Sequence, residues 1–594
     1  MFFTFREVTR IALRINKKYI LSVFFLNAIW GSSAIIGFYL EKLMLDRLVE
    51  NIGNPDVRVV IYVLGLLVAA RLALELTRSL LGRFVRLLRG NMSLLLESEF
   101  DMLMSRKMAE LDIATLEDSE FQDKFTKIRQ ESGRRAWGLM MPLSDIPNYL
   151  VSFISVVGVL FFIHPLVAVL VILVSIPQVI IESRFIKKDY QLTTELAPLY
   201  RKWGWLTHYL TRNRNYMELK ILNLSGYLSR QLKDVQQETN TKIINLDKKR
   251  ELSNFGSEIP FMILEFCITL FLVVWVVVGR ITLGTFQLYL RSLRSAQMNL
   301  TSLVSSFLEI YENYVYVSDL VWFLNLESKI EKVRGGVELN KKDQLSIEFQ
   351  DVWFRYKKGQ AWVIKGVSFK IGPKENLALV GLNGSGKSTL VKLLARFYDP
   401  QKGKILINGH NIRDVDLASW RAQLAVLFQE FETYPFSAAE TIGYGDVERL
   451  NKLSEIKEAA KITGMHEFIE SLPLKYSNPL DPQFDKGVRP SLGQGQRLGI
   501  SRVLFRVRAN VIIMDEPTAS VDPEAEEKIF KELVSKAKNK ILLFVTQRFS
   551  TVRLADKILV MDRGRLIENG SHEELMNLGG KYAKLFNLQA RAYQ

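Results

Sequence analysis

The chain has 594 residues, of which 48% are hydrophobic, and a formal net charge of +16 at pH 7. This length exceeds one domain, and a single cysteine, Cys267, excludes a disulfide framework or a cysteine metal site. The positive charge could indicate nucleic-acid binding, but the basic residues flank apolar runs, as the positive-inside rule places them. We therefore expect a membrane protein that binds no nucleic acid.

Six apolar stretches precede about residue 325, each long enough to cross a bilayer, which takes about 20 residues. They lie near residues 19–40, 59–81, 142–162, 166–184, 259–278 and 285–307. The connections 82–141 and 185–258 are long and basic, which favours the cytoplasmic side. We expect a multi-pass protein of the bacterial inner (plasma) membrane, with both termini and the C-terminal domain in the cytoplasm. The first stretch lacks a small-residue cleavage site, so we expect it to be retained.

The two long connections show helical apolar spacing without Gly/Pro clusters, and should continue the membrane helices into the cytoplasm. Within them, residues 117–127 and 218–230 are typical of short transverse helices, although their charge pattern alone favours ordinary solvated helix.

Several charged residues fall at membrane depth, where such groups normally face the protein interior or a wet cavity. They indicate either a path for polar or anionic groups or internal ion pairs. The i,i+4 spacing of Arg71 and Glu75 favours a pair between these two. For Glu265, Arg291 and Arg294 both interpretations stay open.

A segment rich in Lys, Glu and Gly, residues 327–344, is predicted to link a transmembrane domain (1–326) to a C-terminal domain (345–594). From Leu345 onward, strands and helices alternate, as in a mostly parallel sheet covered by helices. The expected fold is an α-helical membrane domain with an α/β phosphate-loop nucleotide-binding domain.

The C-terminal domain contains the phosphate-loop pattern G-x-x-x-x-G-K-[S/T] at Gly381–Ser388, directly after the apolar run 377–380. Its glycines let backbone N–H groups close around phosphates, and the following helix directs its positive end at the same anion. Lys387 should reach the β- and γ-phosphates, and the Ser388 hydroxyl should bind Mg²⁺. The residues expected around the nucleotide are Asn383, Gly384, Ser385, Gly386, Lys387, Ser388 and Thr389.

A second nucleotide motif lies farther along the chain, where the apolar run 511–514 ends in two carboxylates, Asp515 and Glu516. Asp515 is placed to hold Mg²⁺, directly or through water, and Glu516 to polarise the attacking water. Either motif alone could arise by chance, but together they specify a nucleoside triphosphatase.

The order of these motifs resembles the nucleotide-binding domain of ATP-binding cassette (ABC) proteins. The whole chain resembles an exporter-type half-transporter, with six membrane helices fused to one cassette. The resemblance implies ATP and Mg²⁺ as ligands, Tyr356 as the aromatic that stacks on adenine, and Gln429 as a catalytic and Mg²⁺-contacting residue. It also implies that Ser491, Gly493 and Gln494 bind the ATP held by a second chain.

The signature and the switch residue depart from the family pattern. In the signature, whose usual form is Leu-Ser-Gly-Gly-Gln, Pro490 replaces the leucine and Leu492 replaces a glycine, and the Leu492 side chain would crowd a close backbone approach. Gln547 stands where the family has a catalytic switch histidine. Glutamine can hydrogen-bond the γ-phosphate but cannot exchange a proton near neutral pH. Since Glu516 is retained, we expect slowed hydrolysis.

Two functions remain open from the sequence. The first is ATP-driven export, or flipping, of an amphipathic small molecule, lipid or peptide by alternating access. The second is a slow ATP-gated membrane switch, suggested by Leu492 and Gln547. Because both altered residues occur on one chain beside an intact Glu516, we expect a homodimer surrounded by membrane lipids.

Overall fold

The computed structural model describes residues 2–52, 57–211, 216–328, 330, 336–340, 344–517, 523–546 and 548–592. The chain divides into two compact units. A helical unit comprises Met1–Glu110 and Ser119–Leu326, and an α/β unit comprises Leu111–Asp118 and Glu327–Gln594. The segment Leu111–Asp118 thus groups with the α/β unit although it lies between two helices of the helical unit in the sequence.

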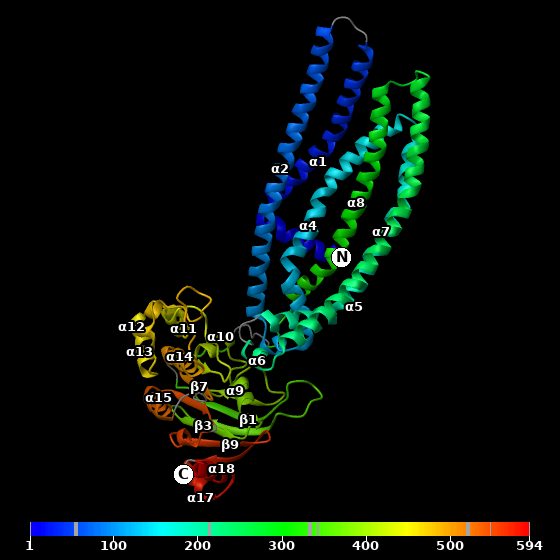
Figure 1. Cartoon of the computed structure of the whole chain (residues 1–594). Coiled ribbons are helices and arrows are strands. Elements are labelled where there is room, and N and C mark those ends of the chain that lie inside the picture. The colour runs from blue at the N-terminus through cyan, green and yellow to red at the C-terminus, as the bar shows by residue number, and fades with distance from the viewer. Residues whose placement is uncertain are drawn as a thin grey trace. The chain divides into compact units, whose positions relative to one another are not determined.

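In its described part the helical unit consists of long helices and one short helix, α6 (Figure 1). These helices are α1 (Phe2–Glu50), α2 (Val57–Glu110), α4 (Ser119–Phe161), α5 (Pro165–Thr211), α6 (Tyr216–Ile221), α7 (Ser225–Val277) and α8 (Leu283–Leu324). Each of the six predicted apolar stretches corresponds to a separate long helix, although 142–162 and 259–278 each end one residue beyond the helix. The helices also run through most of both long connections, which confirms the predicted continuation beyond the apolar stretches.

Four of the described helical segments are long and apolar enough, by length and composition, to cross a membrane. They are Asn16–Glu50, Gly138–Phe161, Pro165–Thr211 and Ser225–Val277. The helices α2 and α8 cover the other two predicted stretches, and their crossing of the membrane stays a prediction.

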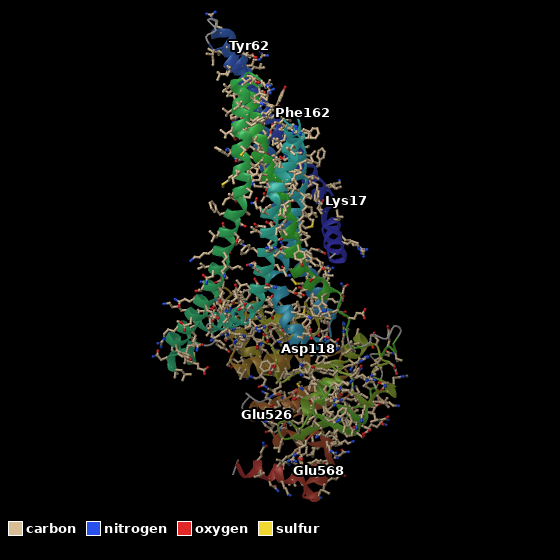
Figure 2. The ribbon with its side chains drawn as sticks, turned by 90° about the vertical axis from the view of Figure 1, so that its right-hand side faces the viewer. Lys17, Tyr62, Asp118, Phe162, Glu526 and Glu568 are labelled. Carbon is tan, nitrogen blue, oxygen red and sulfur yellow. The ribbon has the colours of Figure 1, made fainter. Side chains whose placement is uncertain are left out.

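Apolar side chains from several helices form the core of the helical unit. Val156 and Leu160 of α4 pack with Leu272 of α7 and Leu293 of α8, all fully buried. The exposed aromatic residues Tyr62 and Phe162 lie nearer one end of this unit than Lys17 does (Figure 2). Many other apolar side chains of the unit face outward, as a helix surrounded by lipid requires.

The short helices in the two connections do not have the predicted bounds. The first is α3 (Ile113–Leu116), and residues 119–127 begin the long helix α4 instead. The second is α6, which ends before α7 begins at Ser225. The predictions of 117–127 and 218–230 were wrong because the helical spacing of these segments belongs mainly to the long helices that follow.

The α/β unit contains two sheets in its described part. The larger has the order β10-β9-β3-β8-β7-β6, and its strands are parallel except for β10, as the sequence predicts for most of the sheet. The smaller has the order β2-β1-β4-β5 and is antiparallel, which the sequence did not predict. The strands are β1 (Ile347–Phe354), β2 (Ile364–Ile371), β3 (Asn376–Gly381), β4 (Lys402–Ile407), β5 (His410–Asn411), β6 (Leu424–Leu427), β7 (Val511–Asp515), β8 (Ile541–Val545), β9 (Lys557–Asp562) and β10 (Arg565–Gly570).

Helices cover the sheets and add a helical cluster. The α-helices are α9 (Lys387–Leu394), α10 (Leu417–Ala422), α11 (Ala438–Gly443), α12 (Leu453–Ile462), α13 (His466–Ser471), α14 (Leu492–Phe505), α15 (Pro523–Lys536), α16 (Phe549–Val552), α17 (His572–Leu578) and α18 (Lys581–Ala592), and the 3-10 helices are Val447–Arg449 and Lys475–Ser477.

Strand β3 shows how the parallel sheet is buried on both faces. Leu377 and Leu379 belong to a core shared with the antiparallel sheet and α9. Ala378 and Val380, on the opposite face, belong to a core with α14 and α15. This explains the unbroken apolar run before the phosphate loop, since a strand covered on both faces need not alternate.

Candidate nucleotide site

The predicted nucleotide residues gather at the carboxyl ends of neighbouring parallel strands. The phosphate loop follows β3, Asp515 ends β7, and β8 lies between these two strands. Gln429 follows β6, the neighbour of β7. Since carboxyl ends of parallel strands meet at one edge, ligands of α/β sheets bind there.

Two glycines allow the phosphate loop its shape. Gly381 has φ +152°, and a Cβ there would lie 2.3 Å from the carbonyl oxygen of Met561. Gly386 has φ +103° and caps the N-terminus of α9. A residue with a Cβ would be strained at either position. Glycine therefore leaves the loop backbone accessible at the helix N-terminus, where anions bind.

Lys387 lies inside this loop. Its Nζ donates hydrogen bonds to the carbonyls of Gly381 (2.8 Å) and Leu382 (3.1 Å). Burial lowers the pKa of Lys387, while the nearby carboxylates of Glu516 and Asp515 act in the opposite direction. The ammonium is therefore placed on the loop that the sequence predicts to hold phosphates.

Asp515 fits the predicted Mg²⁺ site. Its side chain is nearly fully buried and lies beside Ser388. Among the described residues its Oδ1 has no hydrogen-bond partner, and neither has the buried Oγ of Ser385. Burial raises the pKa of Asp515 and the carboxylate of Glu516 adds to this, against the effects of Ser388 and Lys387. A buried carboxylate oxygen without a partner, beside a hydroxyl, suits a hard cation that prefers oxygen ligands.

Among the described residues no group of three or more His, Cys, Asp or Glu could hold a metal by itself. Mg²⁺ typically takes one or two protein ligands and completes its shell with phosphates and water. Ser388 and Asp515 are the residues that would hold it here.

Glu516 is fixed by three segments. It has φ +50°, which is uncommon for a residue other than glycine. Its N–H donates to the carbonyl of Val545 (2.9 Å), and its carbonyl accepts from Gln496 Nε2 (3.0 Å). Gln429 Nε2 donates to its carboxylate at 3.3 Å. The structure thus brings together two residues, Gln429 and Glu516, that are 87 positions apart.

Tyr356 lies beside the phosphate-loop helix. Its hydroxyl shares a hydrogen bond of 3.0 Å with Thr389 Oγ1. Its ring meets Phe354 and Tyr398 edge to face, with centroid distances of 5.0 and 5.3 Å. The side chain remains partly exposed, as a ring that stacks on a base requires.

The signature residues lie at the start of α14. Ser491 caps this helix in a capping box, since Gln494 N–H donates to Ser491 Oγ (3.2 Å) and Ser491 N–H donates to Gln494 Oε1 (2.8 Å). In the described part of the chain these hydrogen bonds join the two residues to each other and not to the phosphate loop. Leu492 is 70% exposed. The signature therefore forms a second candidate surface, made of Ser491, Gly493 and Gln494. These residues lie far from the phosphate loop in the sequence.

The predicted catalytic residue Gln547 lies outside the described residues. Sequence reasoning also missed three residues that the structure joins to the site. Gln496 holds the Glu516 carbonyl, and Tyr398 and Glu117 form a chain of contacts to Tyr356. Gln496 could have been found from its place two residues after the signature, but nothing in the sequence relates Glu117 to Tyr398.

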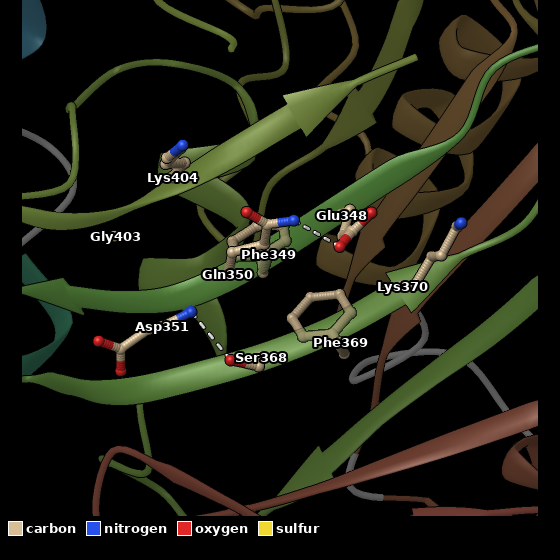
Figure 3. Close-up of a pocket in the computed structure, with 9 residues that line it drawn as sticks. All are labelled: Glu348, Phe349, Gln350, Asp351, Ser368, Phe369, Lys370, Gly403 and Lys404. Carbon is tan, nitrogen blue, oxygen red and sulfur yellow. Dashed lines mark hydrogen bonds between the residues drawn. The ribbon is translucent and has the colours of Figure 1, made fainter. Parts of the chain in front are cut away.

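A separate hollow of about 690 Å³ lies over the antiparallel sheet (Figure 3). Phe349 and Phe369 stack there with centroids 4.4 Å apart, and Ser368 Oγ accepts a hydrogen bond from the Asp351 N–H. None of the predicted site residues lines this hollow. The chemistry of the nucleotide site lies at the strand ends instead.

The charged residues at membrane depth form ion pairs within the helical unit. Glu41 of α1 contacts Arg291 at 2.8 Å and Arg71 at 3.8 Å. Arg294 pairs with Glu265. The predicted pair between Arg71 and Glu75 is wrong, because Glu75 pairs with Arg78 one turn away and Arg71 turns toward Glu41.

The motifs and the geometry agree with a comparison to protein families. Residues 364–519, which include the phosphate loop, the signature and both carboxylates, match the family described as ABC transporter. Relatives of that type align with the chain over almost its whole length. Residues 364–519 therefore form an ABC transporter domain, and the chain as a whole is similar to ABC transporters.

Three comparisons describe its place among ABC transporters. The subtilin transport ATP-binding protein SpaT of Bacillus subtilis is 27% identical over 97% of this chain and 92% of its own length. An ATP-dependent lipid A-core flippase of Alkalilimnicola ehrlichii is 39% identical over 41% of this chain and 40% of its own. A solved structure of a bacterial Atm1-family ABC exporter with ATP bound has a TM-score of 0.81 at 21% identity, over 97% of this chain and 98% of that one.

The chain therefore has the fold of ABC exporters, with an N-terminal domain of apolar helices and a C-terminal α/β nucleotide-binding cassette. Its cassette is that of an ABC transporter ATPase, and its relatives include ATP-binding transport proteins. Together with the apolar helices, the membrane-transporter relatives identify a multi-pass membrane protein.

Proposed function

We propose that this ABC exporter moves an amphipathic compound across the bacterial inner membrane by alternating access, driven by ATP binding and hydrolysis between two copies of the chain. The observation that carries the proposal is the meeting of Lys387, Ser388 and Asp515 at one edge of the parallel sheet. Lys387 and the loop N–H groups bind the phosphates. Ser388 and Asp515 hold Mg²⁺, which when bound offsets negative charge on the phosphates.

Glu516 is the proposed general base. Its backbone is held from both sides and its carboxylate accepts from Gln429, so a water beside it would be oriented without further reorganisation. Gln429 acts as a positioning residue for that carboxylate. Gln547 would contact the γ-phosphate without exchanging a proton, which makes turnover slow.

A complete site needs a second chain. Ser491 and Gly493 lie at the N-terminus of α14 and are available to an ATP bound by a partner, as in the family. The short helix α6 supports pairing, since its Met217 and Ile221 are each 85% exposed and apolar, whereas Leu219 is buried. Such side chains favour contact with another surface. We propose a homodimer in which α6 and α3 serve as coupling helices.

The substrate is proposed to be an amphipathic lipid, peptide or drug with a polar or anionic group. Arg71, Arg291 and Arg294 carry three positive charges, and their partners Glu41 and Glu265 carry two negative charges. An excess positive charge at membrane depth favours an anionic group on the transported compound. The names of two relatives agree with these substrate classes, since one is named for subtilin and another for lipid A-core.

The proposal is tested by ATPase stimulation in reconstituted membranes, using a panel of lipids, peptides and drugs that includes subtilin and lipid A-core. We expect one class to raise the ATPase rate in a saturable manner. A Lys387→Ala protein, which lacks the phosphate-loop ammonium, is the control and should stay inactive. If no compound stimulates an otherwise active ATPase, the export proposal is wrong.

A further inference from the structure

The connection between α2 and α4 is held to the α/β unit by several contacts. It contains α3 and belongs to that unit. Ile113 and Ala114 pack against the core formed by both sheets. Asp112 caps α3 and accepts a hydrogen bond from Ser328 at 3.2 Å. The segment is therefore fixed by apolar and polar contacts together.

Glu117, directly after α3, binds two side chains of the nucleotide-binding cassette. Its carboxylate accepts hydrogen bonds from the hydroxyl of Tyr398 and from Lys392 Nζ, the latter at 3.0 Å. Burial alone would raise the pKa of Glu117, but the bonds from Tyr398 and Lys392 outweigh it and the pKa is lowered. The carboxylate is thus ionised at neutral pH and accepts from both donors.

Both of these side chains also contact Tyr356. The ring of Tyr398 meets that of Tyr356 at 89°, with centroids 5.3 Å apart. Lys392 Nζ lies 5.6 Å from the centroid of Tyr356. Asp118 adds an ion pair of 3.5 Å with Lys357, the residue after Tyr356. A continuous set of contacts therefore joins α3 to the ring proposed to stack on adenine.

We propose that Glu117 and Tyr398 are positioning residues for the nucleotide base. They hold the Tyr356 ring in the orientation on which the base stacks, so that release of α3 weakens base binding and leaves the phosphate contacts intact. This inference rests on the proposed role of Tyr356. By thermodynamic linkage, binding of the base strengthens the docking of Leu111–Asp118 by the same factor.

The test compares ATP with inorganic tripolyphosphate, which carries the phosphates without a base, on the full-length protein in lipid nanodiscs. We expect Glu117→Ala and Tyr398→Phe each to weaken ATP binding roughly threefold to tenfold, the range of a lost charge-assisted hydrogen bond acting indirectly. Binding of tripolyphosphate should not change. Since both variants remove the hydrogen bond between Tyr398 and Glu117, the double variant should bind ATP no more weakly than the weaker single variant.

Two further variants separate positioning from general damage. Glu117→Gln keeps a carbonyl that can accept from Tyr398 and should restore part of the ATP affinity. Glu120→Ala removes an exposed carboxylate that pairs with Lys124 on its own helix, and should have no effect. Glu117 is itself half-exposed, so its substitution should leave the fold intact.

Hydrogen exchange supplies the reciprocal measurement. ATP should slow amide exchange in residues 111–118 of the parent protein, whereas tripolyphosphate should not. If Tyr356→Ala leaves ATP affinity unchanged, the proposed base-stacking role of Tyr356 is wrong. If Tyr356→Ala weakens ATP binding but Glu117→Ala and Tyr398→Phe do not, or if they weaken both ligands equally, the positioning inference is wrong.

Discussion

At the scale of single residues, Glu516 combines an uncommon backbone conformation with hydrogen bonds to three other segments. Left-handed backbone at a non-glycine residue persists when surrounding contacts determine it, and it is frequent at functional sites. The sequence predicted Asp515 and Glu516 as a pair of carboxylates with different roles. The structure agrees with that difference, since Asp515 is buried beside Ser388 and Glu516 faces Gln429.

The first prediction concerns the general base. Glu516→Gln should lower ATP hydrolysis by roughly 100-fold or more, because a positioned general base contributes about that much. ATP binding should persist, and the protein should accumulate as a closed dimer with ATP retained. Phosphate release and nucleotide retention measure the two effects. The control is Glu527→Gln, at an exposed carboxylate paired within α15, and it should hydrolyse ATP normally. Wild-type turnover in Glu516→Gln would mean that another group organises the water.

The second prediction concerns the residue that replaces the family histidine. Gln547→His should raise turnover, because histidine can share a proton with water and the γ-phosphate. The rate should also gain a pH dependence near the ordinary histidine pKa of about 6.5. Steady-state ATPase rates between pH 6 and 8 check both statements, and adding Glu516→Gln to this variant should abolish the gain. An unchanged or lower rate would mean that glutamine is adapted to this site or that another step limits turnover.

At the scale of elements, apolar runs located the long helices well because burial in lipid or protein needs continuous apolar sequence. The transverse helices were misplaced because a short helix is defined by its caps and tertiary contacts. Asp112 accepts from the Thr115 N–H and starts α3, four residues before the predicted start. The Arg71 prediction failed for a related reason. Helical spacing brought Glu75 within reach, but Glu41 from a neighbouring helix competes for Arg71, and sequence spacing alone does not show such a partner.

The third prediction concerns the arginines of α8. Replacing Arg291 and Arg294 together by Gln should weaken ATPase stimulation by anionic amphiphiles more than by neutral ones, because an anionic group loses its attraction. The measurement is the concentration of each amphiphile that gives half-maximal stimulation.

Two controls accompany this variant. Arg280→Gln, in the exposed turn between α7 and α8, should change neither class of amphiphile. Replacing both Arg294 and Glu265 by Gln removes one ion pair without leaving Glu265 unpaired, and distinguishes charge loss from damage to the helical unit. Equal loss for anionic and neutral compounds would favour a purely structural role for the arginines.

At the scale of the whole molecule, the proposed dimer requires each chain to supply halves of two different nucleotide sites: a phosphate loop with its carboxylates, and a signature at the start of α14. The two residues that differ from the family pattern, Leu492 and Gln547, occur on the same chain, and Glu516 is retained. If the partner were a chain with the usual family residues, Leu492 would impair one nucleotide site and Gln547 the other. In a symmetric pair the two sites are equivalent, and twofold symmetry is the commonest form of oligomer.

The fourth prediction is therefore a homodimer. Expressed alone, the chain should purify as a dimer that hydrolyses ATP, as judged by light scattering and phosphate release. Replacing both Met217 and Ile221 by Ser should reduce coupling of ATPase activity to added substrate, because it removes the exposed apolar side chains by which α6 is proposed to contact another surface. A chain that stays monomeric or inactive until another half-transporter is co-expressed would contradict the homodimer.

ATP-dependent accumulation of a stimulating compound in sealed inside-out vesicles tests the central claim most directly. The account predicts uptake that requires ATP and Mg²⁺, stops in the Glu516→Gln protein and increases in the Gln547→His protein. ATP hydrolysis without accumulation of any compound that stimulates it would contradict export, and would instead support a slow ATP-gated membrane switch.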